Sequence, residues 1–116
     1  MTRVGNALAL IALLVPAAAP AEVLDAAAFA RATEGRTLTY LMGGAPYGVE
    51  RYLPGRQVIW RFRDGPCRRG RWYPEGRAIC FAYDGLDDDQ CWIFRMEGGR
   101  LTASFRGGDE MQVSTA

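Results

Sequence analysis

Short apolar segments alternate with polar residues along most of the chain, and glycine or proline interrupts them every few positions. From residue 36 onward these segments are rich in aromatic and β-branched residues, which favour β-strands. The pattern predicts seven strands, over residues 36–42, 48–53, 57–63, 70–73, 77–84, 90–96 and 100–106. Because short turns join consecutive strands, we expect a mostly antiparallel meander.

The two hairpins between residues 70 and 96 predict a continuous apolar face. We expect Trp72 to lie opposite Ile79, and Phe81 to lie opposite Trp92. In that register one face carries Trp72, Ile79, Phe81, Tyr83, Trp92, Phe94 and Met96. The other face carries Arg71, Cys80, Ala82, Cys91, Ile93 and Arg95. A sheet with one apolar face curls over that face, so we predict a mainly β fold that forms a small barrel or half-barrel.

One helix is predicted before the strands, over residues 22–33. Alanine dominates this segment, Asp25 is placed to cap a first turn, and Gly35 follows its end. The buried stripe would consist of Val23, Leu24 and Phe29, with either Ala30 or Ala32 as a further member. We expect this N-terminal helix to plug one end of the curled sheet.

Residues 1–21 have the three-part layout of a secretory signal. Arg3 precedes an uncharged apolar run, and the segment ends in Ala19-Pro20-Ala21. The run is shorter than the roughly 20 apolar residues that span a membrane. We therefore expect cleavage after Ala21, which leaves a single small β-rich domain, residues 22–116, in the periplasm or outside the cell without a stable membrane anchor.

Charge and composition narrow the range of functions. All 14 basic residues are arginine, and the chain contains neither lysine nor histidine. Without Arg3 the remaining 13 arginines balance the 13 acidic residues, which speaks against a nucleic-acid partner. Without histidine the commonest general base and the usual catalytic zinc ligand are missing. We expect no catalytic residues, no cofactor and no enzymatic activity.

The three cysteines after residue 21 allow one disulfide and one free thiol. In the predicted register Cys80 and Cys91 share a face and lie diagonally on neighbouring strands, so we favour a bridge between them. Cys67 reaches Cys80 only if residues 65–70 fold back. There is no C-x-x-C motif, so we expect no metal site.

Two segments carry candidate binding residues. Arg61 and Arg63 alternate along one predicted strand and Arg71 lies on the next, with aromatic residues between them. Such a face either binds phosphates, carboxylates or acidic glycans, or is simply solvated. The segment Gly43–Gly48, followed by Glu50, presents Tyr47 either in a β-turn or in a loop that inserts into a partner's cleft.

Residues 84–89 form the one acidic cluster of the sequence. Four of these six residues are aspartate, and a hard cation such as calcium prefers such oxygen ligands. The alternating ligands and distal glutamate of an EF-hand are absent. We therefore predict an exposed hairpin loop.

A recurring pattern joins a tyrosine, a glycine turn, a tryptophan strand, a G-x-W step and a cysteine hairpin that closes on a Cys-aromatic pair. Here its elements are Tyr52, Gly55, Trp60, Gly70-Arg71-Trp72, Ile79-Cys80-Phe81, Tyr83 and Cys91-Trp92. In these elements the stretch resembles a family of small exported bacterial proteins of unknown function. The resemblance implies that the two later cysteines are bridged, and Cys67 departs from the simpler two-cysteine version. In architecture the chain also resembles small lipocalin-like periplasmic inhibitors.

Together these features predict a non-catalytic exported β domain that binds a protein or a cell-envelope component. The alternative is an inhibitor of an exported protease or lysozyme that uses the Tyr47 loop.

Overall fold

The computed structural model describes residues 2–3, 5–13, 21–105 and 108–114. Its elements are β1 (Glu22–Val23), α1 (Ala26–Thr33), β2 (Thr37–Met42), β3 (Ala45–Leu53), the 3-10 turn η1 (Pro54–Arg56), β4 (Gln57–Phe62), β5 (Cys67–Glu75), β6 (Ala78–Tyr83), β7 (Gln90–Glu97), β8 (Arg100–Phe105) and β9 (Glu110–Ser114). Part of the predicted signal segment lies outside the described residues, so its cleavage and the domain division at residue 21 stay predictions.

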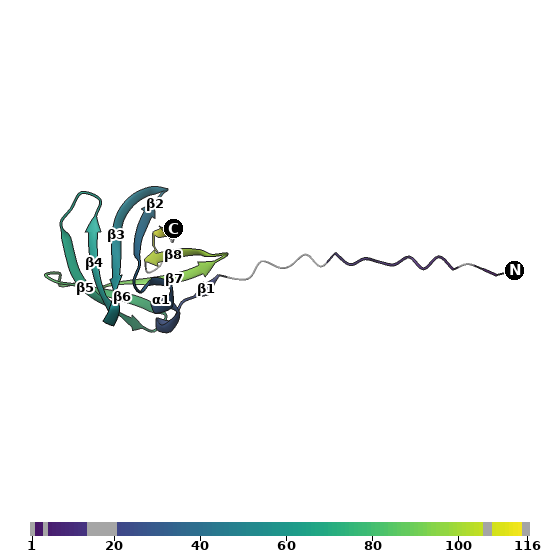
Figure 1. Cartoon of the computed structure of the whole chain (residues 1–116), viewed down its shortest axis with the longest axis horizontal. Helices are drawn as coiled ribbons and strands as arrows, with labels where there is room; N and C mark the ends of the chain where they lie inside the picture. Colours follow the sequence, from purple (N-terminus) through teal and green to yellow (C-terminus); the bar gives the residue numbers. More distant parts are fainter. Residues whose placement is uncertain (1, 4, 14–20, 106–107, 115–116) are drawn as a thin grey trace.

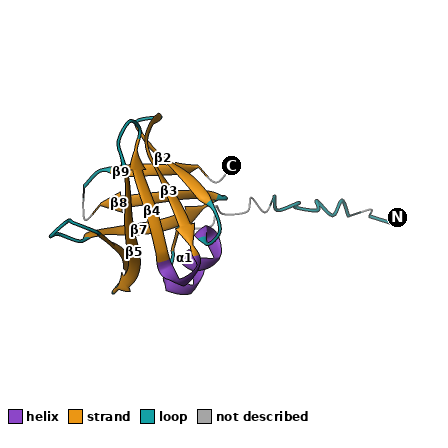
Figure 2. Ribbon diagram, turned by 60° about the vertical axis from the view of Figure 1, so that its left-hand side comes forward, coloured by secondary structure: helices purple, strands orange, loops and turns teal. Residues whose placement is uncertain are grey.

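Strands β2 to β9 form a closed antiparallel barrel of eight strands within the described residues (Figures 1 and 2). Each strand pairs with the next along the chain, and β9 closes the ring because it pairs with both β8 and β2. The short strand β1 pairs with β7. The prediction of a mainly β barrel with one N-terminal helix is confirmed.

The sequence pattern predicts no strand after residue 106, whereas β9 completes the barrel. In β9 the two apolar residues Met111 and Val113 alternate with polar ones and are buried. A strand of five residues with two apolar side chains gives a weak periodic signal. It pairs with β8, which directly precedes it in the chain, and with β2, which lies far away in the sequence.

The predicted register is wrong by two residues in both later hairpins, but the predicted faces are correct. Trp72 lies opposite Phe81, and Trp92 lies opposite Ile79. The turn between β5 and β6 is Gly76-Arg77, with Gly76 at a positive φ of 57°, so Pro74 lies within the strand rather than in the turn. Because side chains alternate with a period of two, a shift of two residues leaves every side chain on its face.

The helix α1 is shorter than predicted and closes one end of the barrel (Figure 2). It begins at Ala26 because the Asp25 carboxylate accepts a hydrogen bond of 2.8 Å from the Ala28 backbone N–H and caps the first turn. Residues 22 and 23, predicted as helix, pair with β7 instead. Phe29 is fully buried, and its ring contacts four aromatic rings of the barrel interior, those of Tyr52, Trp72, Phe81 and Phe94.

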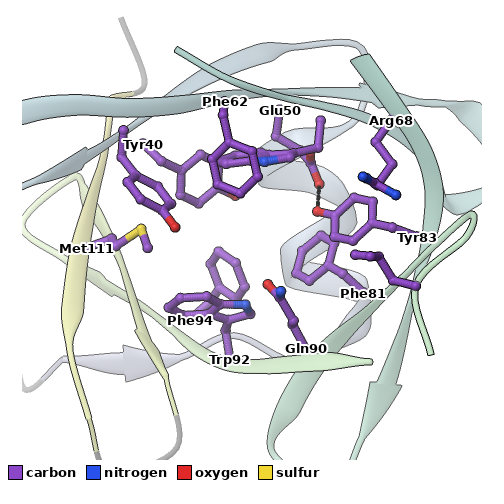
Figure 3. A pocket seen from close by; sticks show the side chains of 13 residues that line it. Tyr40, Glu50, Phe62, Arg68, Phe81, Tyr83, Gln90, Trp92, Phe94 and Met111 are labelled. Atoms are coloured by element: carbon purple, nitrogen blue, oxygen red, sulfur yellow. Dashed lines mark hydrogen bonds between the residues drawn. The ribbon is translucent and has the colours of Figure 1, made fainter. Parts of the chain in front are cut away.

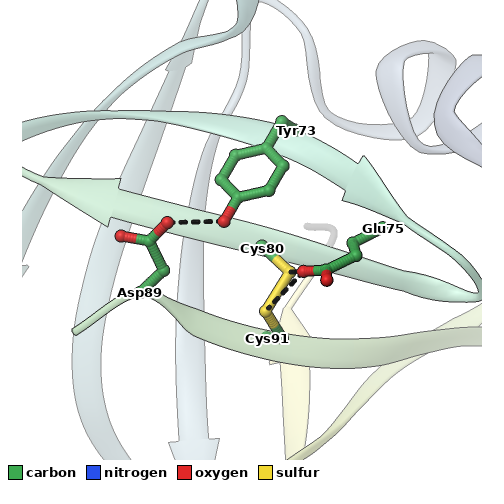
Figure 4. The surroundings of a disulfide bond; sticks show 5 residues. All are labelled: Tyr73, Glu75, Cys80, Asp89 and Cys91. Atoms are coloured by element: carbon green, nitrogen blue, oxygen red, sulfur yellow. Dashed lines mark hydrogen bonds between the residues drawn. A yellow bond between two sulfur atoms is a disulfide. The ribbon is translucent and has the colours of Figure 1, made fainter.

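The predicted disulfide between Cys80 and Cys91 is confirmed, and it lies on the outer face of the barrel (Figure 4). The two cysteines lie directly opposite each other on β6 and β7, rather than diagonally as predicted. Tyr73 and Ile93 pack around them in a small outer cluster. Cys67 is a free, exposed cysteine at the start of β5.

Candidate functional site

A pocket opens at the end of the barrel opposite α1 (Figure 3). The connections β2–β3, β4–β5, β6–β7 and β8–β9 lie at this end, because consecutive strands run in opposite directions. The cavity volume is about 80 Å³, which is room for about three water molecules at the density of the liquid. Its described lining consists of Tyr40, Tyr47, Glu50, Trp60, Phe62, Arg68, Phe81, Tyr83, Leu86, Gln90, Trp92, Phe94 and Met111.

One wall of the pocket is a contiguous group of aromatic rings. The Trp60 ring lies 5.5 Å from the Tyr40 ring, 6.0 Å from the Tyr47 ring and 5.3 Å from the Phe62 ring, measured between centroids. Tyr47 and Phe62 also meet edge to face at 5.4 Å. These geometries are favourable for aromatic pairs, so the wall is stabilised before any ligand arrives.

Tyr47 joins this wall because β3 bulges at that position. Tyr40 pairs with Gly48 and Leu41 pairs with Pro46, so Tyr47 has no partner on β2. A bulge of this kind redirects a side chain. The segment 43–48 is therefore a Gly43-Gly44 turn followed by the start of β3, and the Tyr47 ring packs beside Trp60 and Phe62.

Two glycines make room for the pocket's aromatic side chains. A Cβ atom at Gly48 would lie 2.2 Å from the Trp60 ring, and a Cβ atom at Gly70 would lie 2.7 Å from Cδ1 of Tyr83. Real Cβ atoms do not approach this closely. Glycine at both positions allows Trp60 and Tyr83 to lie against the neighbouring strand.

Glu50 is the one acidic side chain that lines the pocket, and it lies inside the barrel between Gly48 and Tyr52 on β3. Only 1% of its surface is exposed. The Tyr83 hydroxyl donates a hydrogen bond of 2.6 Å to Oε1, whereas Oε2 has no hydrogen-bond partner among the described residues (Figure 3). Burial raises the pKa of Glu50 to about 8, and the Tyr83 hydrogen bond opposes this rise. The carboxyl group of Glu50 is therefore largely protonated at neutral pH.

The tyrosine hydroxyls around Glu50 stay protonated. Tyr40 and Tyr52 are hydrogen-bonded to each other through their hydroxyl groups. Burial raises the pKa of Tyr40, Tyr52 and Tyr83 well above its usual value, and the nearby Glu50 carboxylate adds to the rise. The interior thus offers neutral hydroxyl groups and one carboxyl group inside an apolar wall.

The rim of the open end is apolar. The large hydrophobic side chains that are exposed between residues 21 and 114 lie at the described strand ends and loop of this end, and they are Met42, Tyr47, Phe62, Leu86 and Phe105. Arg68 adds one positive charge at the rim, where its Nη1 donates a hydrogen bond of 3.1 Å to the Asp84 carbonyl oxygen. An exposed apolar rim around a pocket is typical of a ligand entrance.

The predicted arginine face is only partly assembled. Arg61 and Arg71 lie exposed on β4 and β5, but they occupy opposite ends of the paired segment, opposite Cys67 and Gln57 respectively. Arg63 lies in the turn after β4, where its backbone N–H donates to the Tyr47 carbonyl oxygen. These three residues therefore do not converge on one point.

Two further predictions concern metal ligands. The acidic segment 84–89 is an exposed hairpin loop as predicted, and Asp89 accepts a hydrogen bond of 2.5 Å from the Tyr73 hydroxyl. The Glu75 carboxylate lies 3.5 Å from Sγ of Cys80 (Figure 4). Glu75, Cys80 and Cys91 lie close enough together to be considered as metal ligands. Because the sulfur atoms of Cys80 and Cys91 form the disulfide, they are not available as thiolate ligands.

Scans of protein-family models, curated proteins and solved structures each found no match for this chain. The assignment of the fold and of the pocket therefore rests on the sequence and structure of this chain, without support from a relative. Among the described residues, no helix is long and apolar enough to cross a membrane. The family resemblance drawn from the cysteine-hairpin pattern stays a prediction.

Of the pocket residues, Tyr47 is a predicted binding candidate, whereas Phe81, Tyr83, Trp92 and Phe94 are predicted as core rather than as site. Tyr83 and Trp92 stand at inward positions of their strands, and the sequence alone does not distinguish an inward residue that fills the core from one that lines a cavity. The sequence feature that could reveal the pocket is Glu50, because it is a charged residue at an inward position between Gly48 and Tyr52.

Proposed function

We propose that this protein is a non-catalytic, exported binding domain whose open barrel end holds a small apolar or aromatic group of a cell-envelope component. The observation that carries the proposal is the pocket itself: an apolar, mainly aromatic cavity that contains one incompletely bonded, buried carboxyl group. An eight-stranded barrel has an interior just wide enough to be filled by side chains or to hold one small ligand. Here Phe29 fills the closed end and the cavity occupies the open end.

Export is proposed from the layout of residues 1–21, and the disulfide supports it. Disulfides persist in oxidising compartments such as the periplasm and are rare in the cytosol. The bridge joins adjacent strands on the outer face of the barrel, where both cysteines are buried beneath Tyr73 and Ile93.

Inhibition of an exported hydrolase remains the alternative proposal. In this alternative, the loop that carries Tyr47 inserts into the cleft of the hydrolase. The Tyr47 ring is 37% exposed and packs against Trp60 and Phe62, which favours a pocket-lining role over insertion into another protein.

The three tryptophans provide a direct test, because Trp60 and Trp92 line the pocket whereas Trp72 packs against Phe29 at the closed end. We expect neutral benzamide to shift the NMR signals of the Trp60 and Trp92 indole N–H groups in a saturable manner. The Trp72 signal should stay unchanged. Acetamide, which has the amide but lacks the ring, is the matched control and should shift none of them. Benzamide shifts that are absent, or no larger than those with acetamide, would contradict the proposed function.

A further inference from the structure

We propose that the pocket selects a small organic cation that carries N–H donors, an amidinium or an ammonium group, with the Glu50 carboxylate as its counter-ion. This inference rests on the proposed function, since it assigns a charge to the ligand that the open end would hold. It is argued from the unsatisfied oxygen of Glu50, from the aromatic lining and from the charges around the pocket.

The first argument is the incomplete hydrogen bonding of Glu50. Oε1 accepts from Tyr83, but Oε2 is buried without a partner among the described residues. A buried polar atom without a partner costs free energy, and in the carboxylate form of Glu50 a ligand N–H group would supply the donor that Oε2 lacks. Among the described residues, Oε2 receives no hydrogen bond from an arginine or from any other donor.

The second argument is the aromatic lining. Eight of the thirteen described lining residues are aromatic: Tyr40, Tyr47, Trp60, Phe62, Phe81, Tyr83, Trp92 and Phe94. Aromatic rings attract cations that lie within about 6 Å of their centroids, and the attraction is strongest at desolvated sites. A cation that reaches Glu50 therefore has favourable neighbours on several sides, whereas an anion would meet a carboxyl group and electron-rich rings.

The third argument is the distribution of charge around the pocket. The ionisable side chains that face it or lie directly beneath it are Glu50, Tyr40, Tyr47, Tyr52, Tyr83 and Arg68. The pocket residues from β4, β7 and β9 are not ionisable. Arg68 is held at the rim by its hydrogen bond to Asp84, so a ligand with its cation inward and a neutral or anionic group outward fits the arrangement.

Binding of such a cation is coupled to pH. Burial raises the pKa of Glu50 to about 8, so below that pH a cation must displace a proton from the carboxyl group when it binds. We expect the affinity to rise about tenfold per pH unit between pH 6 and 7 and to level off near pH 8. A neutral ligand should show no such dependence.

The test compares three probes of nearly identical shape: benzamidine, which is cationic, benzamide, which is neutral, and benzoate, which is anionic. Isothermal titration calorimetry with the disulfide-bonded protein at pH 7 measures their affinities. We expect benzamidine to bind about tenfold to a hundredfold more tightly than benzamide, as a charge-assisted hydrogen bond predicts, and benzoate to bind most weakly. In Glu50→Gln the preference for benzamidine should disappear while benzamide still binds. Glu75→Gln makes the same chemical change at an exposed site outside the pocket and should behave like the unmodified protein.

A second readout needs no variant. Calorimetry in two buffers with different ionisation enthalpies measures the protons released on binding, and we expect close to one proton per benzamidine at pH 6 to 7 and none for benzamide. If benzamide or benzoate binds as tightly as benzamidine, or if no proton is released, the cation inference is overturned and the proposed binding function stands. If none of the three probes binds, the proposed function itself fails.

Discussion

Glu50 should make the stability of this protein depend on pH in a range where few other groups titrate. Its pKa rises from an ordinary value of 4.5 to about 8 in the folded protein, because burial disfavours the carboxylate. The folded state therefore binds the proton more tightly than the unfolded state. The stabilisation is fully present below pH 4.5 and is lost progressively as the pH rises from 4.5 through 8.

The magnitude follows from the size of the shift. Between these two pH values the free energy of unfolding should fall by about 1.4 kcal/mol per pH unit, or about 5 kcal/mol over the whole range. The chain contains no histidine, so the interval from pH 5.5 to 7.5 is free of the usual imidazole titration. In that interval alone we expect a loss of about 3 kcal/mol.

The assay is urea denaturation followed by circular dichroism at pH 5.5, 6.5 and 7.5, with Glu50→Gln as the test variant. Glutamine keeps an oxygen for the Tyr83 hydroxyl but does not ionise. The variant should therefore show a nearly flat profile and exceed the unmodified protein in stability at pH 7.5. The exposed Glu75→Gln variant should keep the slope of the unmodified protein. Equal slopes in the unmodified protein and Glu50→Gln would refute the reasoning.

Three further variants test the packing and the disulfide. Gly48→Ala places a Cβ atom 2.2 Å from the Trp60 ring, so we expect a loss of about 2 kcal/mol in the free energy of unfolding and an altered tryptophan fluorescence spectrum; a change of less than about 0.5 kcal/mol would mean that the ring is not held there. Replacing Cys80 and Cys91 together by alanine opens a loop with a sequence separation of 11 and should lower the free energy of unfolding by about 3 kcal/mol. Cys67→Ala alters an exposed, unbridged side chain and should leave the denaturation midpoint unchanged, while a shift toward that of the double variant would indicate a different pairing.

The inward face of the barrel could be predicted from the sequence because its signal is local. Trp72, Phe81 and Phe94 stand at the inward positions of the two-residue alternation along their own strands, and all three are buried as expected. The register could not be predicted, since it depends on which residues form each connection: Gly76-Arg77 between β5 and β6, and residues 84–89 between β6 and β7. The disulfide pairing survived the register error because a shift of two residues keeps Cys80 and Cys91 on the same face.

The site was less predictable because it depends on contacts between distant strands. Alternation alone marks Glu50 as inward, but its partner Tyr83 lies 33 residues away and its unbonded Oε2 is visible only in the closed barrel. Closure itself depends on β9, whose pattern is too short to recognise. The direction of Tyr47 depends on a bulge, which no periodic pattern predicts.

The central claim is that the open end of the barrel is a ligand site with Glu50 inside it. The most direct measurement is the set of nuclear Overhauser contacts between bound benzamidine and the protein at pH 7.5. We predict contacts from the probe's ring protons to the indole protons of Trp60 and Trp92, and none to those of Trp72 at the closed end. Contacts to Trp72, or to residues of the outer face and none to the pocket tryptophans, would contradict the account.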